Sequence, residues 1–349
     1  MSKKYVGLDV HMASTSYCIR TAKGKVTGQG VVETTSPTLK DLVRGIGGEV
    51  HLTFEEGTQA SWLYDLLRPE VAGLIVCDPR KAAQQDGNKS DPLDAQRLSE
   101  LLRLGSLKAV YHGEHGTRGL KELVRANRDL VRDVVRVKNR LKAIYRSRGI
   151  AVRGGVLYEG KGRTSYIEQL SGVELRRRVE WYLEQLDGLE ALRRDSESAL
   201  AKEGRRHRGC RVLRSIPGIG PIRAAQVVGV VDTPHRFRTK RKYWSYVGLA
   251  VVMRSSADYI PTPRGFVRKN WKSTRGLNRQ CNRFLKGIYK GAAKDAIAKY
   301  TSWKAYFEGL VERGLAPEVA RVAVARKLAA ISLAVWKKGE LYSQAKTLK

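Results

Sequence analysis

The chain has 349 residues, of which 42% are hydrophobic, so it can bury a sizeable core and is not a disordered chain. The sequence contains no stretch of about 18 apolar residues, which excludes a membrane-spanning helix and a membrane partner. Asp9 lies where a signal peptide needs its apolar stretch, and the four cysteines have neither zinc-ribbon nor disulfide-framework spacing. We therefore expect a cytoplasmic protein.

The formal net charge of +32 is confined to the part of the chain after residue 116. Residues 1–116 carry 14 basic and 14 acidic side chains, whereas residues 117–349 carry 52 basic and 20 acidic ones. A genome rich in Arg codons would raise the basic content everywhere, but the N-terminal part is neutral. Because Lys and Arg release counterions when they contact phosphates, this asymmetry indicates a nucleic-acid partner.

The pattern of residues 1–116 predicts an α/β unit. Short apolar or alternating runs bounded by turn residues predict a three-strand meander followed by two further strands, and stretches with helical spacing separate or follow them. The expected strands are 5–10, 17–21, 30–34, 50–56 and 73–78, and the expected helices are 39–46, 61–67 and 92–104.

Residues 117–206 have the pattern of two long helices. Apolar residues alternate at spacings of three and four from Leu120 to Ile144, with Asn127 on the same seam, and a weaker seam begins at Leu175. We expect an antiparallel helix pair or a dimeric coiled coil, with a glycine-rich loop over 153–162 between the seams. An ordinary helical subdomain is the alternative, because amphipathic helices often resemble short heptad repeats.

Residues 207–349 are mostly helical in pattern and carry a net charge of +23. The expected helices are 221–231, 239–248, 276–300, 301–313 and 317–338. The stretch 251–270 lacks a helical period and contains Pro261 and Pro263, so it is predicted as a long loop.

Five acidic residues in the N-terminal unit are candidates for metal binding. Asp9 lies near the end of the first predicted strand, and Glu55 and Glu56 lie at the end of the fourth predicted strand. Asp91 and Asp94 lie on one face of the first turn of a predicted helix. Acids at strand ends beside an acidic helix face are typical of RNase H-like sites, where two Mg²⁺ ions bridge a scissile phosphate. Taken singly, Asp91 before Pro92 also fits a helix cap.

Two further segments are candidates for contacts with nucleic acid. Gly218 and Gly220 form a Gly-x-Gly turn between apolar helices, the helix-hairpin-helix pattern, whose backbone N–H groups can hold a phosphate; a turn with no ligand is the alternative. The predicted loop contains Ser255 and Ser256. A serine pair in a loop is usually only a polar turn, but cations and a bound phosphate could activate a hydroxyl. The neighbouring basic residues are Arg254, Arg264, Arg268, Lys269 and Lys272.

Together these motifs resemble the DEDD transposases of the IS110 insertion-sequence family, which includes the Piv-type DNA invertases. The matching pieces, spread over nearly the whole chain, are Gly7-Leu-Asp-Val, Phe54-Glu-Glu-Gly, Lys89-Ser-Asp-Pro-Leu-Asp-Ala, Ile216-Pro-Gly-Ile-Gly and Tyr246-Val-Gly-Leu-Ala with the serine loop. The resemblance implies a RuvC-like (RNase H-like) domain over 1–116, a coiled-coil segment over 117–206, and a mainly helical transposase domain over 207–349.

The resemblance also implies an activity. It implies a bacterial, nucleoid-associated transposase that binds Mg²⁺ through its four acids and cleaves and rejoins donor and target DNA through a phosphoserine link. A structured non-coding guide RNA from the element would pair with both DNAs. Strand exchange at two DNA sites suggests a homodimer or tetramer.

Carried over by residue, Asp9, Asp91 and Asp94 match three of the four acids. Counting from the strand favours Glu55 as the fourth, whereas counting back from Trp62 favours Glu56. Counting from Gly248 gives Ser256 as the nucleophile. However, Val251 replaces a proline and Ala257 a glycine of the family pattern, so Ser255 remains an alternative.

Two other functions compete with this one. A RuvC-like nuclease or Holliday-junction resolvase would use the acids and water, without a covalent intermediate. A decayed transposase would bind nucleic acid without catalysis, but the presence of all four acids argues against it.

Overall fold

The computed structural model describes residues 2–79, 90–113, 116–255, 259–268 and 272–344. The chain forms two compact units, Met1–Glu114 and His115–Lys349. None of the described helices combines the length and the apolar character that a membrane crossing requires.

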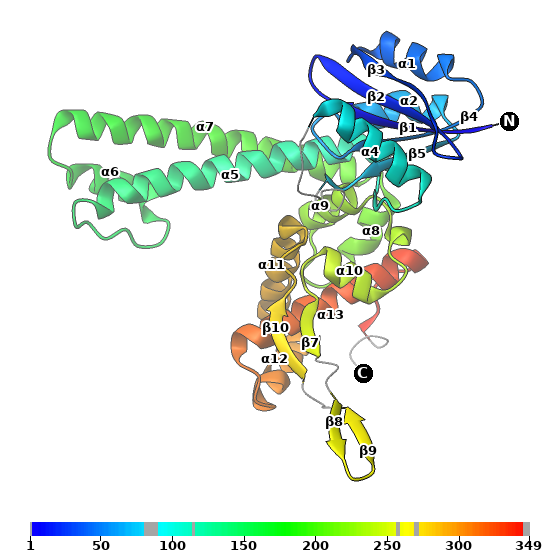
Figure 1. Ribbon diagram of the computed structural model, residues 1–349. Coiled ribbons are helices and arrows are strands. Elements are labelled where there is room, and N and C mark those ends of the chain that lie inside the picture. The colour runs from blue at the N-terminus through cyan, green and yellow to red at the C-terminus, as the bar shows by residue number, and fades with distance from the viewer. Residues whose placement is uncertain (1, 80–89, 114–115, 256–258, 269–271, 345–349) are drawn as a thin grey trace. The chain divides into compact units, whose positions relative to one another are not determined.

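The N-terminal unit is a mixed sheet with helices on both faces (Figure 1). Its strands are β1 (Lys3–Val10), β2 (Ser14–Thr21), β3 (Val26–Glu33), β4 (Glu49–Glu55), β5 (Gly73–Cys77) and β6 (Ala109–Val110), and its helices are α1 (Ser36–Gly45), α2 (Ala60–Leu67), η1 (Arg68–Glu70) and α4 (Asp91–Arg103). The strand order is β3-β2-β1-β4-β5-β6, with β1, β4 and β5 mutually parallel and their neighbours antiparallel. This is an RNase H-like sheet, and every strand and helix predicted here is confirmed.

Alternation along the strands divides the residues between the two faces of this sheet. Val6 and Leu8 of β1 and Leu52 and Phe54 of β4 are buried in one cluster with α1 and α2. The residues between them therefore point to the opposite face. Helix α4 lies on that face directly over Gly7, since a Cβ there would stand 2.3 Å from the Ala95 carbonyl oxygen.

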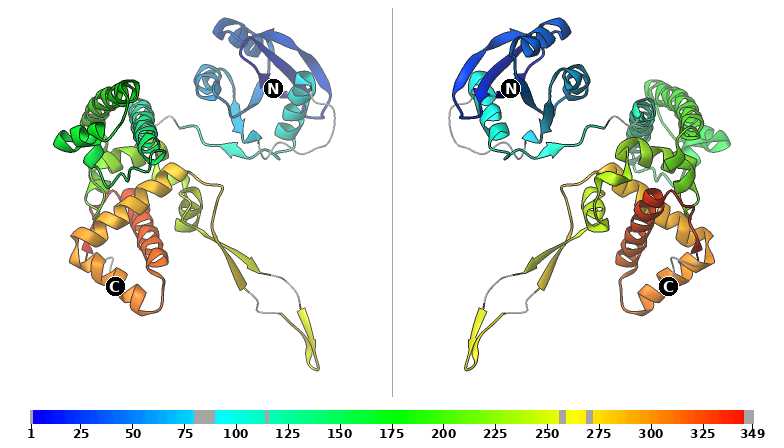
Figure 2. Two further views of the ribbon diagram at one scale, coloured as in Figure 1. Left: turned by 90° about the vertical axis from the view of Figure 1, so that its left-hand side faces the viewer. Right: turned by 90° about the vertical axis from the view of Figure 1, so that its right-hand side faces the viewer.

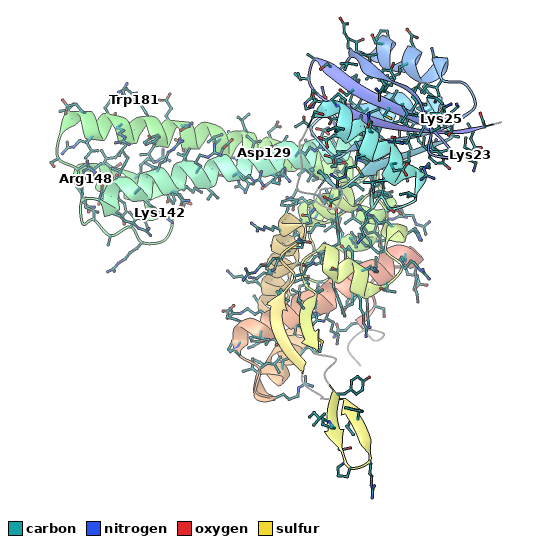
Figure 3. The ribbon with its side chains drawn as sticks, in the orientation of Figure 1. Lys23, Lys25, Asp129, Lys142, Arg148 and Trp181 are labelled. Carbon is teal, nitrogen blue, oxygen red and sulfur yellow. The ribbon has the colours of Figure 1, made fainter. Side chains whose placement is uncertain are left out.

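The C-terminal unit begins with two long antiparallel helices (Figures 1 and 2). This is the antiparallel helix pair, which is one of the predicted arrangements. The two helices are α5 (Arg118–Arg146) and α7 (Val173–Gly204), joined by η2 (Val156–Tyr158) and α6 (Gly160–Glu168). The predicted loop over 153–162 is thus wrong in part, because η2 lies within it and α6 begins at Gly160. Lys142 of α5, Arg148 just after the end of α5, and Trp181 of α7 lie toward the end of the pair that carries α6 (Figure 3).

Polar contacts fix the register of the pair. The Asn127 side-chain amide donates to Ser196 Oγ at 2.9 Å, and Lys138 Nζ pairs with Glu190 Oε1 at 2.7 Å. Asn127 is buried and also accepts from Gln226 Nε2 at 3.1 Å. A seam asparagine therefore sets register here as expected.

The remaining helices form one apolar core together with the first turns of α5. They are α8 (Arg208–Arg214), α9 (Pro221–Val231), η3 (Pro234–Arg236), α10 (Lys240–Tyr246), α11 (Arg283–Lys299), α12 (Thr301–Glu312) and α13 (Pro317–Lys338). The helix predicted over 276–300 begins only at Arg283, where Asn282 caps it by accepting from the Leu285 N–H.

The predicted loop over 251–270 is wrong, because this stretch contains strands. β7 (Val251–Ser255) pairs with β10 (Lys272–Leu277), and β8 (Tyr259–Thr262) pairs with β9 (Gly265–Arg268), both antiparallel. The physical reason is that β-branched and aromatic residues run without helical period on both sides of Pro263, and proline favours a turn.

Candidate active site

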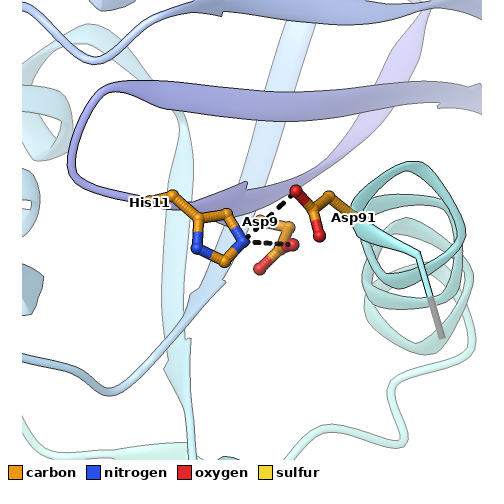
Figure 4. Close-up of side chains that lie close together, drawn as sticks. All are labelled: Asp9, His11 and Asp91. Carbon is orange, nitrogen blue, oxygen red and sulfur yellow. Dashed lines mark hydrogen bonds and ion pairs between the residues drawn. The ribbon is translucent and has the colours of Figure 1, made fainter.

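Two acids and a histidine of the N-terminal unit meet at the end of β1 (Figure 4). One ligand atom each from Asp9, His11 and Asp91 lie within 4.8 Å of one another. His11 Nε2 is 3.2 Å from Asp9 Oδ2 and 3.5 Å from Asp91 Oδ2, so the imidazole contacts both carboxylates. Asp9 and Asp91 lie 82 positions apart in the chain, and the packing of α4 on Gly7 brings them together.

The electrostatics of this cluster favour a bound cation. Burial raises the pKa of Asp9, the His11 imidazole lowers it, and the negative charges of Asp91 and Asp94 raise it further. The ionised form of Asp9 therefore destabilises the folded protein. Carboxylate oxygens are the ligands that Mg²⁺ prefers, so this donor set fits the ion.

Asp94 belongs to the same helix turn as Asp91. Both acids lie in the first turn of α4, whose Asp94 backbone N–H donates to the Ser90 carbonyl. Asp94 is half-buried and close enough to Asp9 to raise its pKa.

The two glutamates after Phe54 lie in different surroundings. Leu8 of β1 is the register partner of Phe54 of β4, and both are buried on the α1 and α2 side. Asp9 and Glu55 follow these two residues, so alternation puts them together on the α4 face. Glu55 is also the register partner of Cys77, which packs with Leu98 of α4.

Glu56 has a different partner. Its Oε2 is 2.7 Å from Nε2 of His112, and the His112 ring stacks on Tyr64 of α2 with 5.0 Å between ring centroids. Glu56 is thus engaged with residues that pack toward α2, and the acidic cluster lies on the α4 side of the sheet.

His11 is the residue of this cluster that sequence reasoning missed. It lies two positions after Asp9, beyond the end of the strand, and its spacing alone gives no metal motif. The sequence does show that His11 follows Asp9 by two positions, and this spacing places the two side chains on the same side of an extended chain.

The predicted helix-hairpin-helix turn lies between α8 and α9. Gly218 has a φ of +79°, and a Cβ on it would stand 2.2 Å from the Ala292 carbonyl oxygen of α11. Arg223 stabilises the turn, because its guanidinium donates to the Gly218 carbonyl at 2.8 Å and to the Asp295 carboxylate at 2.5 Å. Gly218 therefore packs against α11, whereas a Cβ added to Gly220, at the N-terminus of α9, would meet nothing within 4 Å.

The candidate nucleophiles lie at the end of β7. Ser255 is its last residue, whereas Ser256 lies outside the described residues, as does Lys269. The start of the ribbon β7–β10 is anchored on α10, since the Ala250 N–H donates to the Trp244 carbonyl and Asn278 donates to Ser245. Arg254 lies in β7, Arg268 in β9 and Lys272 in β10, and Arg264 is exposed in the turn between β8 and β9.

An RNase H-like sheet with clustered carboxylates at the end of its first strand, followed by a strongly basic helical region, is the architecture of an enzyme that transfers phosphoryl groups of DNA. Residues 6–147 match a family model described as a transposase, that of the DEDD domain of IS110 elements. Residues 210–306 match the model described as "Transposase IS116/IS110/IS902 family". The chain belongs to the IS110 family of transposases.

A curated relative covers nearly the whole chain. It is the "Putative transposase y4qE" of Sinorhizobium fredii (strain NBRC 101917 / NGR234), which is 24% identical over 356 residues, covering 95% of this chain and 88% of the relative.

Proposed function

We propose that this transposase cleaves and rejoins DNA with a Mg²⁺ site in its N-terminal unit and a serine nucleophile in its C-terminal unit. The observation that carries the proposal is the meeting of Asp9 and Asp91 on the α4 face of an RNase H-like sheet. The acids rest on this geometry and on the family resemblance, and the serine rests on the family resemblance.

We assign the metal to Asp9, Glu55, Asp91 and Asp94. The register partnership of β1 and β4 supports Glu55 over Glu56, because it puts Glu55 on the face of Asp9. A bound Mg²⁺ pair would neutralise charge on a phosphate and on its leaving oxygen. The hydrogen bond from His112 keeps Glu56 as a positioning residue for the end of β4.

The serine step exchanges one phosphate ester for another. The hydroxyl of Ser256, or of Ser255 as the alternative, loses its proton, and its Oγ bonds to phosphorus. The bond from phosphorus to a deoxyribose oxygen breaks, and that oxygen takes up a proton. Rejoining reverses these changes with the hydroxyl of another strand as the attacking group, so no external energy source is needed.

The partners follow from charge and from the family. The net charge of +23 in residues 207–349 supports donor and target DNA and a structured non-coding guide RNA as ligands. We propose three functional segments, 1–116, 117–206 and 207–349, working in the bacterial cytoplasm at the nucleoid. Gly220, Arg254, Arg264, Arg268, Lys269 and Lys272 are the proposed contacts to nucleic acid, whereas the packing of Gly218 supports a structural role.

Trapping of a protein–DNA adduct tests the serine step. Full-length protein, guide RNA and labelled element DNA are mixed with Mg²⁺, denatured, and separated by electrophoresis. We expect a labelled adduct that is lost in Ser256→Ala and kept in Ser255→Ala. Cleaved DNA without any adduct contradicts the serine step and favours the water-using nuclease.

We also propose that the acids and the serine of one active site come from different copies of the chain. The acids lie in one compact unit of the chain and the serine in the other, so two copies can each contribute one part of a site. Asp9→Asn and Ser256→Ala proteins are each expected to be inactive alone and to regain cleavage when mixed. Mixed oligomers that form but never cleave refute the shared site.

A further inference from the structure

The hairpin formed by β8 and β9 exposes apolar side chains that the proposed chemistry does not use. Phe266 is 75% exposed, Tyr259 59%, Val267 57% and Ile260 46%. All residues of β8 are exposed, and so are Gly265, Phe266 and Val267 of β9. A two-stranded hairpin is marginally stable in water unless something covers it, so this element has the character of a binding surface.

The register gives the hairpin two different faces. Pro261 is the partner of Phe266, and Tyr259 lies two residues before Pro261, so these three side chains share one face. Ile260 is the partner of Val267 on the other face. One face is thus aromatic, and the other is aliphatic.

The charge of the surrounding segment identifies the kind of partner. Residues 251–277 contain six basic side chains and one acidic one. Arg264 lies at the exposed turn between the strands. Aromatic side chains interleaved with positive charge fit nucleic acid, because the charges bind phosphates and the rings stack on bases. A protein partner would need only the apolar faces.

The position of the hairpin in the chain selects DNA over RNA as the partner. The hairpin is inserted between β7, which ends at the candidate nucleophile Ser255, and β10. The nucleophile must lie at the DNA strand that is cut. Thr262, the last residue before the hairpin turn, lies seven positions after Ser255, so it is at most about 25 Å from that serine. At 3.4 Å per base pair this is about seven base pairs of duplex.

We propose that the β8–β9 hairpin is a DNA-binding ribbon that enters the duplex within about seven base pairs of the cleaved bond, with Phe266 against the bases. A two-stranded ribbon fits a DNA groove, and apolar side chains can wedge between base steps and unstack them. The choice of DNA over RNA and the placement beside the cleaved bond rest on the proposed function, whereas the aromatic and basic character of the hairpin, which fits nucleic acid, does not.

The test uses full-length Ser255→Ala/Ser256→Ala protein, which forms no adduct, so that binding is measured apart from the chemistry. The probe is a duplex that spans one end of the insertion element and its flanking DNA. We expect Phe266→Ala to raise the Kd for this duplex by about 5- to 150-fold, the range for losing one base–aromatic stack. Trp181→Ala is the matched control, because it removes a 57% exposed aromatic from α7, and we expect less than a two-fold change.

A second readout detects the bases directly. We expect thymines within about seven base pairs of the cleaved bond to react with permanganate when this protein is bound, and this reactivity to be lost in Phe266→Ala. The thermal midpoint of Phe266→Ala is expected to equal that of its parent, because the side chain is exposed. If thymines react only at more distant positions, the placement of the hairpin beside the cleaved bond is wrong. The Kd measurement then still decides whether the hairpin binds DNA.

Three results overturn the proposal. They are a Kd within two-fold of the parent's, a loss of guide-RNA binding with DNA binding intact, and a change of oligomeric mass with DNA binding intact. Failure of the adduct experiment leaves these measurements unaffected, so the two proposals can fail separately.

Discussion

Gly218→Ala is expected to destabilise the C-terminal unit strongly, whereas Gly220→Ala, two residues away in the same turn, is not. A side chain at φ +79° costs about 1–2 kcal/mol in the left-handed region. The new Cβ would also lie 2.2 Å from the backbone of Ala292, and backbone cannot rotate away as a side chain can. Relief of that overlap requires α11 to move, at about 1–3 kcal/mol. The total is about 2–5 kcal/mol.

Gly220→Ala meets neither obstacle. Its φ of −77° suits any residue, and nothing lies within 4 Å of the added Cβ. As an N-cap change it is expected to cost less than about 1 kcal/mol. Chemical denaturation followed by circular dichroism, together with DNA binding, measures both effects. Equal stability of the two variants would refute the packing argument, and loss of DNA binding in Gly220→Ala alone would support the phosphate contact.

Three further predictions concern the N-terminal unit. Asp9→Asn in chelator at pH 7 is expected to match or exceed the wild-type melting temperature, because the raised pKa of Asp9 means that its ionised form destabilises the fold. This difference shrinks as the pH falls through the pKa of Asp9, and a scan that shows it growing contradicts the sign. Glu55→Gln is expected to abolish cleavage and the thermal shift caused by Mg²⁺, whereas Glu56→Gln retains both; the reverse outcome reassigns the fourth acid. Gly7→Ala is expected to cost about 1–3 kcal/mol on the same overlap argument, and to lower activity by displacing α4.

The N-terminal sheet could be predicted almost element by element because each strand carries its own signal. Val6 and Leu8 alternate with Gly7 and Asp9, and turns with glycine bound the strands. Local propensity, burial and turn chemistry agree along this unit, which makes sequence patterns reliable. The long seam from Leu120 likewise predicted helix α5, since its period holds over many turns.

The hairpin segment could not be predicted in the same way. Its strands β8 and β9 have four residues each and bury neither face, so no alternation of apolar and polar residues marks them. Pro261 and Pro263 also argue against a strand when a sequence is considered alone. Cross-strand pairing supplies the missing information, and pairing is not a local property. The side chains of these strands are exposed, which is why the strands leave no pattern in the sequence. The same exposed side chains are the reason for proposing a DNA ligand.

The choice between Glu55 and Glu56 as the fourth acid depends on the structure and could not be made from the sequence. Glu55 is the last residue of β4, Glu56 follows it directly, and both are exposed, so neither hydropathy nor spacing separates them. A shift of one residue along a strand moves a side chain to the opposite face of the sheet. The pairing of Leu8 with Phe54 therefore puts Glu55 on the same face of the sheet as Asp9, whereas Glu56 contacts His112, whose ring stacks on Tyr64 of α2. An active site of this kind depends on which face α4 covers, and α4 covers the face on which Gly7 leaves room for its backbone.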